Sequence, residues 1–326
     1  MIMVTGGAGF IGSNLQAALA LRGQETVVVD WLGSADKWRN LAAHPPSRVV
    51  PPEQVDAFLA AEPPLDAVVH MGAISATTAT DADEAWQTNV ELSQRLWDWC
   101  ARRAVRLLYA SSAATYGDGG QGFDDDGSVA HLSALRPLNL YGWTKNAFDL
   151  RVARILEAGR ARPPQWAGLK FFNVYGPNEY HKGGMISVVK VKHDEVVAGG
   201  PARLFKADQP GMADGAQRRD FIWVGDVVDV MLWLLDTPGV CGLFNVGTGQ
   251  ARTYLDLAHA VCDAAGAPRR VEFIDMPETL LGQYQSFTEA RTERLRAAGY
   301  PGQFTPLEEG IRRYVQDFLA TGEPYL

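Results

Sequence analysis

The first half of the chain alternates short, nearly continuous apolar runs with longer segments in which apolar residues recur at helical spacing. Such runs favour buried strands, and strands that alternate with helices are typical of a parallel sheet covered on both faces. The pattern therefore predicts an α/β fold with a Rossmann-like doubly wound parallel sheet. The expected strands are Ile2–Thr5, Thr26–Asp30, Ala67–Met71, Arg106–Ser111 and Leu169–Val174, and the expected helices are Ile11–Arg22, Glu53–Ala61, Ala82–Arg103 and Tyr141–Gly159.

The second half is less regular and predicts a smaller unit that grows from the carboxyl side of the sheet. We therefore expect a Rossmann domain over residues 1–173, with returning segments near 219–247, and a smaller α/β domain mainly over 174–326. The expected strands here are Leu204–Lys206, Phe221–Val224, Phe244–Val246 and Val271–Ile274, and the expected helices are Ile186–Ala198, Asp226–Leu235, Tyr254–Ala265, Thr288–Ala298 and Leu307–Leu319.

Two segments break the periodic pattern and are expected to be mobile surface loops. Residues 117–128 combine several glycines with a run of aspartates, and residues 206–217 are rich in glycine, proline and small polar residues. The aspartate run has no histidine beside it and no spacing suited to a bidentate glutamate. We therefore interpret it as a solvated loop and predict no metal site.

Composition and charge exclude several classes of protein. The chain has 326 residues, 47% hydrophobic and 21% charged, which is ordinary for a soluble globular protein. Its net charge of −8 is opposite in sign to that expected of a nucleic-acid binder or an acidic-membrane binder. An apolar strand begins near residue 2 and leaves no room for a signal peptide, and Cys100, Cys241 and Cys262 suit reduced thiols. We therefore predict a cytoplasmic protein.

The segment VTGGAGFIGSN follows the first expected strand and begins a helix. Gly6, Gly9 and Gly12 fit the fingerprint of dinucleotide-binding proteins. One glycine allows the tight turn, one lets the backbone approach a pyrophosphate, and one lets the helix pack closely on the strand. Phe10 and Ile11 begin the helix, whose free N–H groups and dipole favour phosphate. We predict that these five residues bind the cofactor.

The end of the second strand bears on which dinucleotide binds. Asp30 stands where a carboxylate accepts hydrogen bonds from the adenosine ribose, which is typical of NAD sites. Lys37 and Arg39 follow soon afterwards, and either cation could neutralise a 2′-phosphate. We expect NADP, with NAD as the alternative.

Tyr141 and Lys145 are four residues apart and would share one helix face. A phenol titrates near pH 10, and a neighbouring ammonium together with a positive nicotinamide ring would lower its pKa. Lys145 would also hold the nicotinamide ribose. The segment YASSAATYG places hydroxyl residues at the carboxyl end of a strand, where open α/β sheets bind ligands. Ser112 is our choice for the hydroxyl that shares the reacting oxygen with Tyr141; a backbone-capping role is the alternative for this serine.

Four segments carry a resemblance that covers essentially the whole chain. TGGAGFIG, YASSAATYG, YGWTK and FFNVYGP resemble the extended short-chain dehydrogenase/reductase superfamily of nucleotide-sugar epimerases and dehydratases. HMGAISATT, HKGGM, RRDFIWVGDVVDV, GLFNVGTGQA and GQYQSFTEA, in that order, resemble the bacterial ADP-glyceromanno-heptose 6-epimerase family. That family makes the heptose of the lipopolysaccharide inner core. Its members favour NADP and are commonly oligomers, so we expect a homo-oligomer.

The resemblance implies inversion at C6″ of an ADP-heptose through transient oxidation to a 6″-ketone. Tyr141 and Lys182 would be the two acid/base groups, although Lys182 could instead only bind the pyrophosphate. Gln283 departs from the arginine expected beside Tyr284. The catalytic residues implied are Tyr141, Lys145, Ser112 and Lys182, and the substrate-binding residues implied are Ser112, Asn173, His181, Lys182, Arg219 and Tyr284.

Two other functions stay open at this stage. The first is a different nucleotide-sugar epimerase that resembles the UDP-hexose 4-epimerases, and the second is a non-catalytic dinucleotide-binding protein. A dehydratase is disfavoured, because Ala113, Ala114 and Thr115 follow the serines where that branch commonly carries an Asp-Glu pair. Trp97 and Trp99 could form a helical face for self-association or belong to the core.

Overall fold

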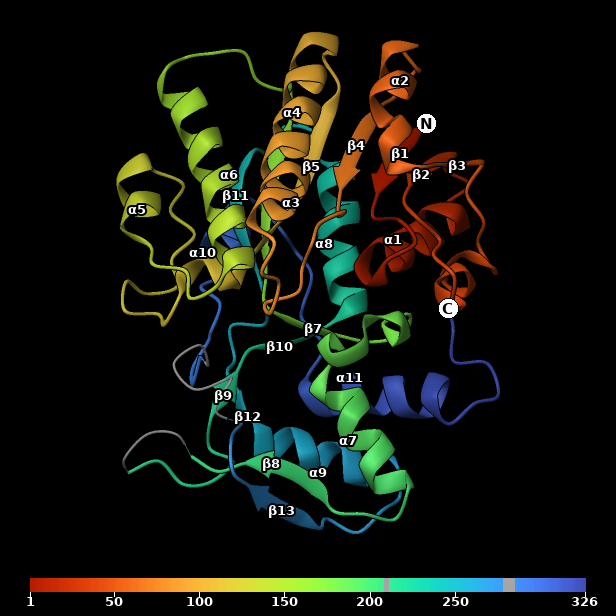
Figure 1. Ribbon diagram of the computed structural model, residues 1–326, viewed down its shortest axis with the longest axis vertical. Helices are drawn as coiled ribbons and strands as arrows, with labels where there is room; N and C mark the ends of the chain where they lie inside the picture. Colours follow the sequence, from red (N-terminus) through yellow and green to blue (C-terminus); the bar gives the residue numbers. More distant parts are fainter. Residues whose placement is uncertain (208–210, 278–284) are drawn as a thin grey trace.

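The structure is a computed structural model that describes residues 1–207, 211–277 and 285–326. Its larger part is a seven-stranded sheet in the order β11-β6-β5-β4-β1-β2-β3, with every neighbouring pair parallel (Figure 1). The predicted doubly wound parallel sheet is therefore confirmed. The strands are β1 Ile2–Thr5, β2 Thr26–Val29, β3 Arg48–Val50, β4 Ala67–His70, β5 Arg106–Ser112, β6 Trp166–Phe171 and β11 Gly242–Val246.

Both faces of this sheet are buried. Successive side chains of a strand point to opposite faces, so neighbouring residues pack in different clusters. Val4 packs in a cluster with α1 (Phe10–Leu21) and α8 (Val224–Asp236), while Met3 packs in a second cluster with α2 (Val55–Ala60), α4 (Leu92–Arg103) and α6 (Leu140–Glu157). Trp97 and Trp99 lie in the second cluster, with 0% and 8% of their surface exposed. They belong to the core of this chain.

The expected helix Ala82–Arg103 is interrupted. It forms as α3 (Ala82–Trp86), a π-helical turn at Gln87–Glu91, and α4. Asn89 in this turn accepts a hydrogen bond from the Ile74 N–H and donates to the Ile74 carbonyl, both at 2.9 Å, and its amide also donates to the Thr144 hydroxyl at 3.0 Å. The turn therefore fastens the loop after β4 to α6, and π turns inside α-helices are frequent at functional sites.

The smaller part lies beyond the carboxyl edge of the large sheet (Figure 1). Its core packs α7 (Val188–Val197), α9 (Tyr254–Ala264) and α11 (Leu307–Arg313) with the parallel strand pair β8 (Ala202–Phe205) and β13 (Val271–Ile274). Two further pairs connect the two parts: β7 (Asn173–Tyr175) with β10 (Phe221–Trp223), and β9 (Arg218–Arg219) with β12 (Arg252–Thr253). The shorter elements are α5 Val129–Ala134, α10 Glu293–Ala297 and the turns Asp36–Leu41, Pro52–Gln54, Ala113–Tyr116, Tyr180–Met185 and Tyr314–Leu319.

The predicted helix Thr288–Ala298 is wrong in its first half, since only Glu293–Ala297 is helical. The backbone of the first half bonds elsewhere. The Thr288 N–H donates to the Arg218 carbonyl at 3.2 Å, and the Ala290 N–H donates to the Asp220 carboxylate at 3.0 Å. These partners come from a distant part of the chain and compete with helix formation.

The acidic segment 117–128 is not simply a solvated loop. Asp125 has 2% of its surface exposed, and its carboxylate accepts the Asn245 N–H at 2.8 Å. Asp124 and Asp125 also pair with Arg291 and Arg294, at 3.4 and 3.5 Å. Two of the aspartates therefore fasten the segment to β11 and to α10. Within the described ranges, no group of three or more His, Cys, Asp or Glu side chains is arranged to hold a metal ion.

The three cysteines are free thiols, with Cys100 and Cys262 buried and Cys241 partly exposed. Among the residues that the structure describes, no helix has both the length and the apolar character needed to cross a bilayer.

Candidate active site

The glycine turn lies where the strand order reverses, between β1 and β4, which is where open α/β sheets bind ligands. Gly6 has φ of 66°, and a Cβ there would lie 2.6 Å from the Gly72 Cα. A Cβ on Gly12 would overlap the Gly6 carbonyl oxygen. Gly9 is the N-cap of α1 and bears no side chain that could bond the first turn. The backbone can thus approach a pyrophosphate, and the residues present fit a dinucleotide.

Asp30 closes the other side of the turn and is buried. Its carboxylate accepts the Ala8 N–H at 2.9 Å and pairs with the Lys37 ammonium at 2.7 Å. Arg39 pairs with both oxygens of Glu323, each at 3.0 Å. Both cations that we considered for a 2′-phosphate therefore have carboxylate partners, although each lies beside the turn as expected.

Asn139 starts the helix that carries the tyrosine and the lysine. Its side chain accepts the Gly142 N–H at 2.9 Å and caps α6. One turn further, the Lys145 ammonium donates to the Ala110 carbonyl of β5 at 2.8 Å and lies 6.0 Å from the centre of the Tyr141 ring. The side chain of Ser112, which ends β5, accepts the Ala114 N–H at 3.1 Å and so caps the turn Ala113–Tyr116, the alternative role that we considered for it. It also hydrogen bonds to Tyr141. The structure therefore brings all three predicted residues together.

Burial has the largest effect on the pKa values of this group. Burial raises the pKa of Tyr141, the Ser112 hydrogen bond opposes that shift, and Asp149 adds to it. Burial lowers the pKa of Lys145 to about 8, against an opposing effect of Asp149. We expected Lys145 and a nicotinamide ring together to lower the tyrosine pKa, and that joint effect stays a prediction. In this structure burial has the largest influence on the Tyr141 pKa, and the Lys145 ammonium donates to the Ala110 carbonyl.

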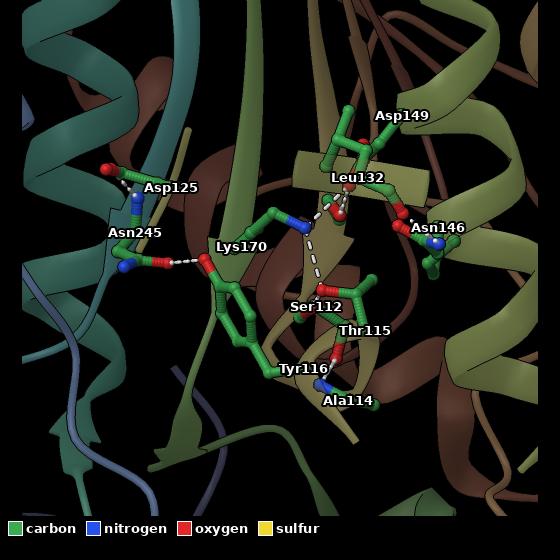
Figure 2. Close-up of polar contacts among 12 residues, drawn as sticks. Ser112, Ala114, Thr115, Tyr116, Asp125, Leu132, Asn146, Asp149, Lys170 and Asn245 are labelled. Carbon is green, nitrogen blue, oxygen red and sulfur yellow. Dashed lines mark hydrogen bonds and ion pairs between the residues drawn. The ribbon is translucent and has the colours of Figure 1, made fainter. Parts of the chain in front are cut away.

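A buried polar network lies behind these residues and was not predicted (Figure 2). Lys170 of β6 pairs with Asp149 of α6 at 2.8 Å, and both side chains are fully buried. Lys170 also donates to the Thr115 hydroxyl at 2.7 Å. Beside it, the Tyr116 hydroxyl donates to Asn245 at 2.6 Å. The network links α6 and β6 to the turn that follows Ser112.

The turn Tyr180–Met185, which contains HKGGM, lies over the glycine loop. The Lys182 ammonium is 5.1 Å from the centre of the Phe10 ring, at the start of α1. His181 hydrogen bonds to Asn40 at 3.2 Å, and the Asn40 amide also donates to the Ala8 carbonyl at 2.9 Å. Desolvation lowers the pKa of His181 to about 4, and the charges of Lys37 and Lys182 add to this shift. Burial also lowers the pKa of Lys182.

Glu179 fixes this turn at both ends and was missed by sequence reasoning. Its buried carboxylate accepts the Ser187 N–H at 2.7 Å, the Ser187 hydroxyl at 2.5 Å and the Tyr314 hydroxyl at 2.9 Å. Its charge opposes the lowering of the Lys182 pKa. A carboxylate directly before a glycine-bounded loop was the available signal, but its partners are distant in sequence.

The remaining predicted residues lie between the two parts of the fold. Asn173 is exposed on β7, and its side-chain oxygen accepts the Thr288 hydroxyl at 3.4 Å. Arg219 is buried on β9, with its guanidinium 5.8 Å from the centre of the Tyr254 ring. The prediction for Tyr284, like the remark on Gln283, falls outside the described residues.

The predicted residues therefore form two groups at one edge of the sheet. Ser112, Tyr141 and Lys145 gather at the end of β5, and Lys182 joins Phe10 at the turn after β1. A phenolic oxygen that can accept a proton, two cations with lowered pKa values and a glycine turn open to a pyrophosphate are parts that proton transfer beside a bound dinucleotide requires.

Comparison with known proteins agrees with this arrangement. The sequence profile of the NAD dependent epimerase/dehydratase family matches residues 2–247. The chain is 49% identical over 333 residues to an ADP-L-glycero-D-manno-heptose-6-epimerase of Nitratidesulfovibrio vulgaris strain DP4, with 100% of both chains covered. It is 43% identical to the protein of that name from Fusobacterium nucleatum subsp. nucleatum, again with 100% of both covered.

Solved structures are similar along nearly the whole chain. The ADP-L-glycero-D-manno-heptose-6-epimerase of Helicobacter pylori superposes with a TM-score of 0.79 at 25% identity, over 98% of this chain and 96% of that one. The UDP-glucose 4-epimerase of Thermus thermophilus, in complex with NAD, gives 0.75 at 28% identity, over 95% and 96%.

Proposed function

The chain belongs to the NAD dependent epimerase/dehydratase family, and we propose that it inverts C6″ of ADP-D-glycero-D-manno-heptose to give ADP-L-glycero-D-manno-heptose. Two relatives named ADP-L-glycero-D-manno-heptose-6-epimerase, 43% and 49% identical over their full length, support this substrate. The observation that carries the chemistry is the contact of Ser112, Tyr141 and Lys145 at the carboxyl end of β5. The product would supply heptose for the lipopolysaccharide core.

The reaction would proceed through a 6″-ketone of the sugar. A nicotinamide dinucleotide, which the glycine turn and Asp30 would hold, supplies reversible hydride transfer at C6″. Tyr141 would take the proton of the C6″ hydroxyl, with Ser112 bonded to the same oxygen. Lys145 would hold its positive charge beside the phenolic ring. Lys182 would handle the proton on the opposite side of the carbon, because inversion requires acid/base groups on two sides.

We assign the other contacts by the same reasoning. Asn173, His181, Arg219 and Tyr284 would bind the nucleotide sugar. Residues 1–173, with returning segments near 219–247, would bind the cofactor, and residues 174–326 would mainly bind the substrate. The separate core of α7, α9 and α11 supports this division. The protein would act in the cytoplasm as a homo-oligomer.

The test of this function is NMR of a panel of sugar nucleotides incubated with the protein. We expect inversion at C6″ of ADP-heptose and no change in UDP-glucose. In deuterated water, C6″ should keep its hydrogen, since a hydride that stays on the bound cofactor does not exchange with solvent. A chain that epimerises UDP-hexoses and leaves ADP-heptose untouched would be a 4-epimerase instead. Bound nicotinamide with no turnover on any sugar nucleotide would indicate a binding protein.

For the cofactor we propose NADP, with Lys37 neutralising its 2′-phosphate and Arg39 as the alternative cation. Replacing Lys37 with Ala should weaken NADPH binding about tenfold, as for the loss of one charge-assisted hydrogen bond. NADH binding should change little, because it has no 2′-phosphate. Fluorescence titration of both reduced cofactors measures the difference. Lys206→Ala, which removes an exposed lysine paired with Asp275, is the matched control. An equal loss for NADPH and NADH would contradict the assignment.

A further inference from the structure

Lys170 is an unusual residue for its position. It is the fifth of the six residues of β6, whose other five residues are uncharged and buried, and its own side chain has 0% exposed surface. Its partner Asp149 is equally buried, 2.8 Å away. Taking two charges out of water costs several kcal/mol per ion, and apolar residues in their place are often as stable or more so. The pair therefore calls for a reason other than stability.

The pair is hydrogen bonded across three elements (Figure 2). The Asp149 carboxylate accepts the Ser111 hydroxyl at 2.6 Å and the Tyr109 hydroxyl at 3.1 Å, in addition to Lys170. Lys170 donates to the Thr115 hydroxyl at 2.7 Å. Such a network holds α6, β5 and β6 in one fixed arrangement.

The same network reaches Ser112 and the stretch of β5 that Lys145 contacts. The Thr115 hydroxyl, which accepts from Lys170, donates in turn to the Ser112 carbonyl at 2.8 Å. On the helix, Asp149 follows Lys145 by one turn, so both project toward β5. Two consecutive residues of β5 therefore bind these two side chains of α6. The Ala110 carbonyl accepts a hydrogen bond from Lys145, and the Ser111 hydroxyl donates to Asp149.

We propose that Asp149 and Lys170 are positioning residues, which hold Ser112 against Tyr141 and fix the charge that faces Tyr141 and Lys145. Neither residue touches the reacting atoms on this view. Asp149 supplies a fixed negative charge one turn behind the lysine, and Lys170 neutralises it from the sheet while fastening the turn that follows Ser112.

The charged and titratable groups around the site come from six segments. His70 of β4 has its pKa lowered to about 3 by burial and by Lys145, so it is neutral. Burial raises the pKa of Tyr109 and Tyr116, so both are neutral as well. Asp125 of the acidic segment lies beyond Tyr116, and burial raises its pKa. The other charged groups are Lys145 and Asp149 of α6 and Lys170 of β6.

The sign of the effect follows from these groups. Asp149 raises the pKa of Tyr141 and of Lys145. Replacing Asp149 with Asn removes this negative charge and leaves Lys170 positive, so both pKa values should fall. Replacing Lys170 with Met in the same chain removes the second charge and should reverse most of the shift. If the network were only structural, D149N would change the stability of the protein and leave the pKa values of Tyr141 and Lys145 where they are.

The experiment compares wild type, D149N and D149N/K170M. In D149N we expect the acid limb of kcat/KM to move down by about one pH unit, the size of shift that a nearby charge produces. NMR of the protein with ¹³Cζ-labelled tyrosine, and without substrate, should show the Tyr141 signal titrating lower by the same amount. The double variant should return both readings close to wild type. Conservative K170R, which keeps the charge, should leave both unchanged.

A second variant tests the geometry without altering charge. Thr115→Val removes the link from Lys170 to the Ser112 carbonyl and should lower kcat about tenfold with KM unchanged, as for a slight misplacement of a reacting group. Unaltered kcat in folded T115V, or an unmoved Tyr141 titration in folded D149N, would overturn the proposal. Only the kinetic measurements rest on the proposed function. The tyrosine titration needs no substrate and stays informative if the sugar assignment fails.

Discussion

Replacing Tyr141 with Phe is expected to abolish C6″ inversion in a chain that still folds and binds its ligands. The phenolic oxygen is the group that would accept the substrate proton, and Ser112 bonds to it at the carboxyl end of β5. General acid–base catalysis by a positioned side chain contributes about 10²–10⁴-fold to a rate. We expect kcat to fall by about 10³-fold. NMR of the C6″ signals under saturating ADP-heptose measures the loss directly.

The matched control is Tyr300→Phe, which removes a phenol hydroxyl from the contact with Trp233 and Phe304, away from the site. That variant should keep wild-type turnover. Cofactor binding by Y141F should fall by much less than its turnover, because the glycine turn and Asp30 are intact. Inversion by Y141F at the wild-type rate would show that Tyr141 is not the base, and the mechanism proposed here would then be wrong.

Much of the fold could be predicted because its signals are local. Strands buried on both faces read as continuous apolar runs, and β1, β2, β4 and β5 lie within one residue of their expected bounds. The dinucleotide turn could be predicted from the spacing of its glycines, and the structure leaves little room for a side chain at these positions. The Tyr–Lys pair depends on helical spacing alone, and Asn139 caps that helix as expected of its residue type.

The short strand β3 was missed because its three residues give little pattern, and two of them, Arg48 and Val49, are exposed. The helix Thr288–Ala298 was drawn too long because spacing alone cannot reveal that the Ala290 N–H bonds to Asp220. The same reason explains Asp125, which reads as one of a solvated run yet is buried against the Asn245 backbone. In the last two cases a partner far along the chain decides the outcome.

Asp149 and Lys170 had a signal that sequence reasoning left unused. A lysine inside a continuous apolar strand must be paired, because a buried lysine without a partner is rare. Asp149 follows Lys145 by four residues and therefore faces the same strand. Each observation predicts a buried partner without saying which residue it is. The pairing itself depends on β6 lying next to β5, which is a property of the sheet order.

Replacing Lys182 with Met is expected to stop inversion while leaving nucleotide-sugar binding nearly unchanged. Burial lowers the pKa of this lysine, and a lowered pKa makes an ammonium a better proton donor near neutral pH. Its ammonium lies over the Phe10 ring beside the glycine turn, in a loop that Glu179 fixes through Ser187. We expect kcat to fall by about 10²–10³-fold with little change in KM, as for a lost acid/base group. Initial rates over a range of ADP-heptose concentrations separate the two constants.

If Lys182 only contacts the pyrophosphate, the opposite result is expected for K182M: KM should change and kcat should not. Removing a contact made equally in the ground and transition states raises KM and leaves kcat unchanged. Lys182→Arg sharpens the distinction, since a guanidinium keeps the charge but does not release its proton in this range. K182R should restore a pyrophosphate contact but not an acid/base role. Lys190→Met, which removes a lysine paired with Asp194 on the next helix, is the control and should keep both constants. A normal kcat with a raised KM in K182M, rescued by K182R, would assign Lys182 to binding and leave the second proton to another group.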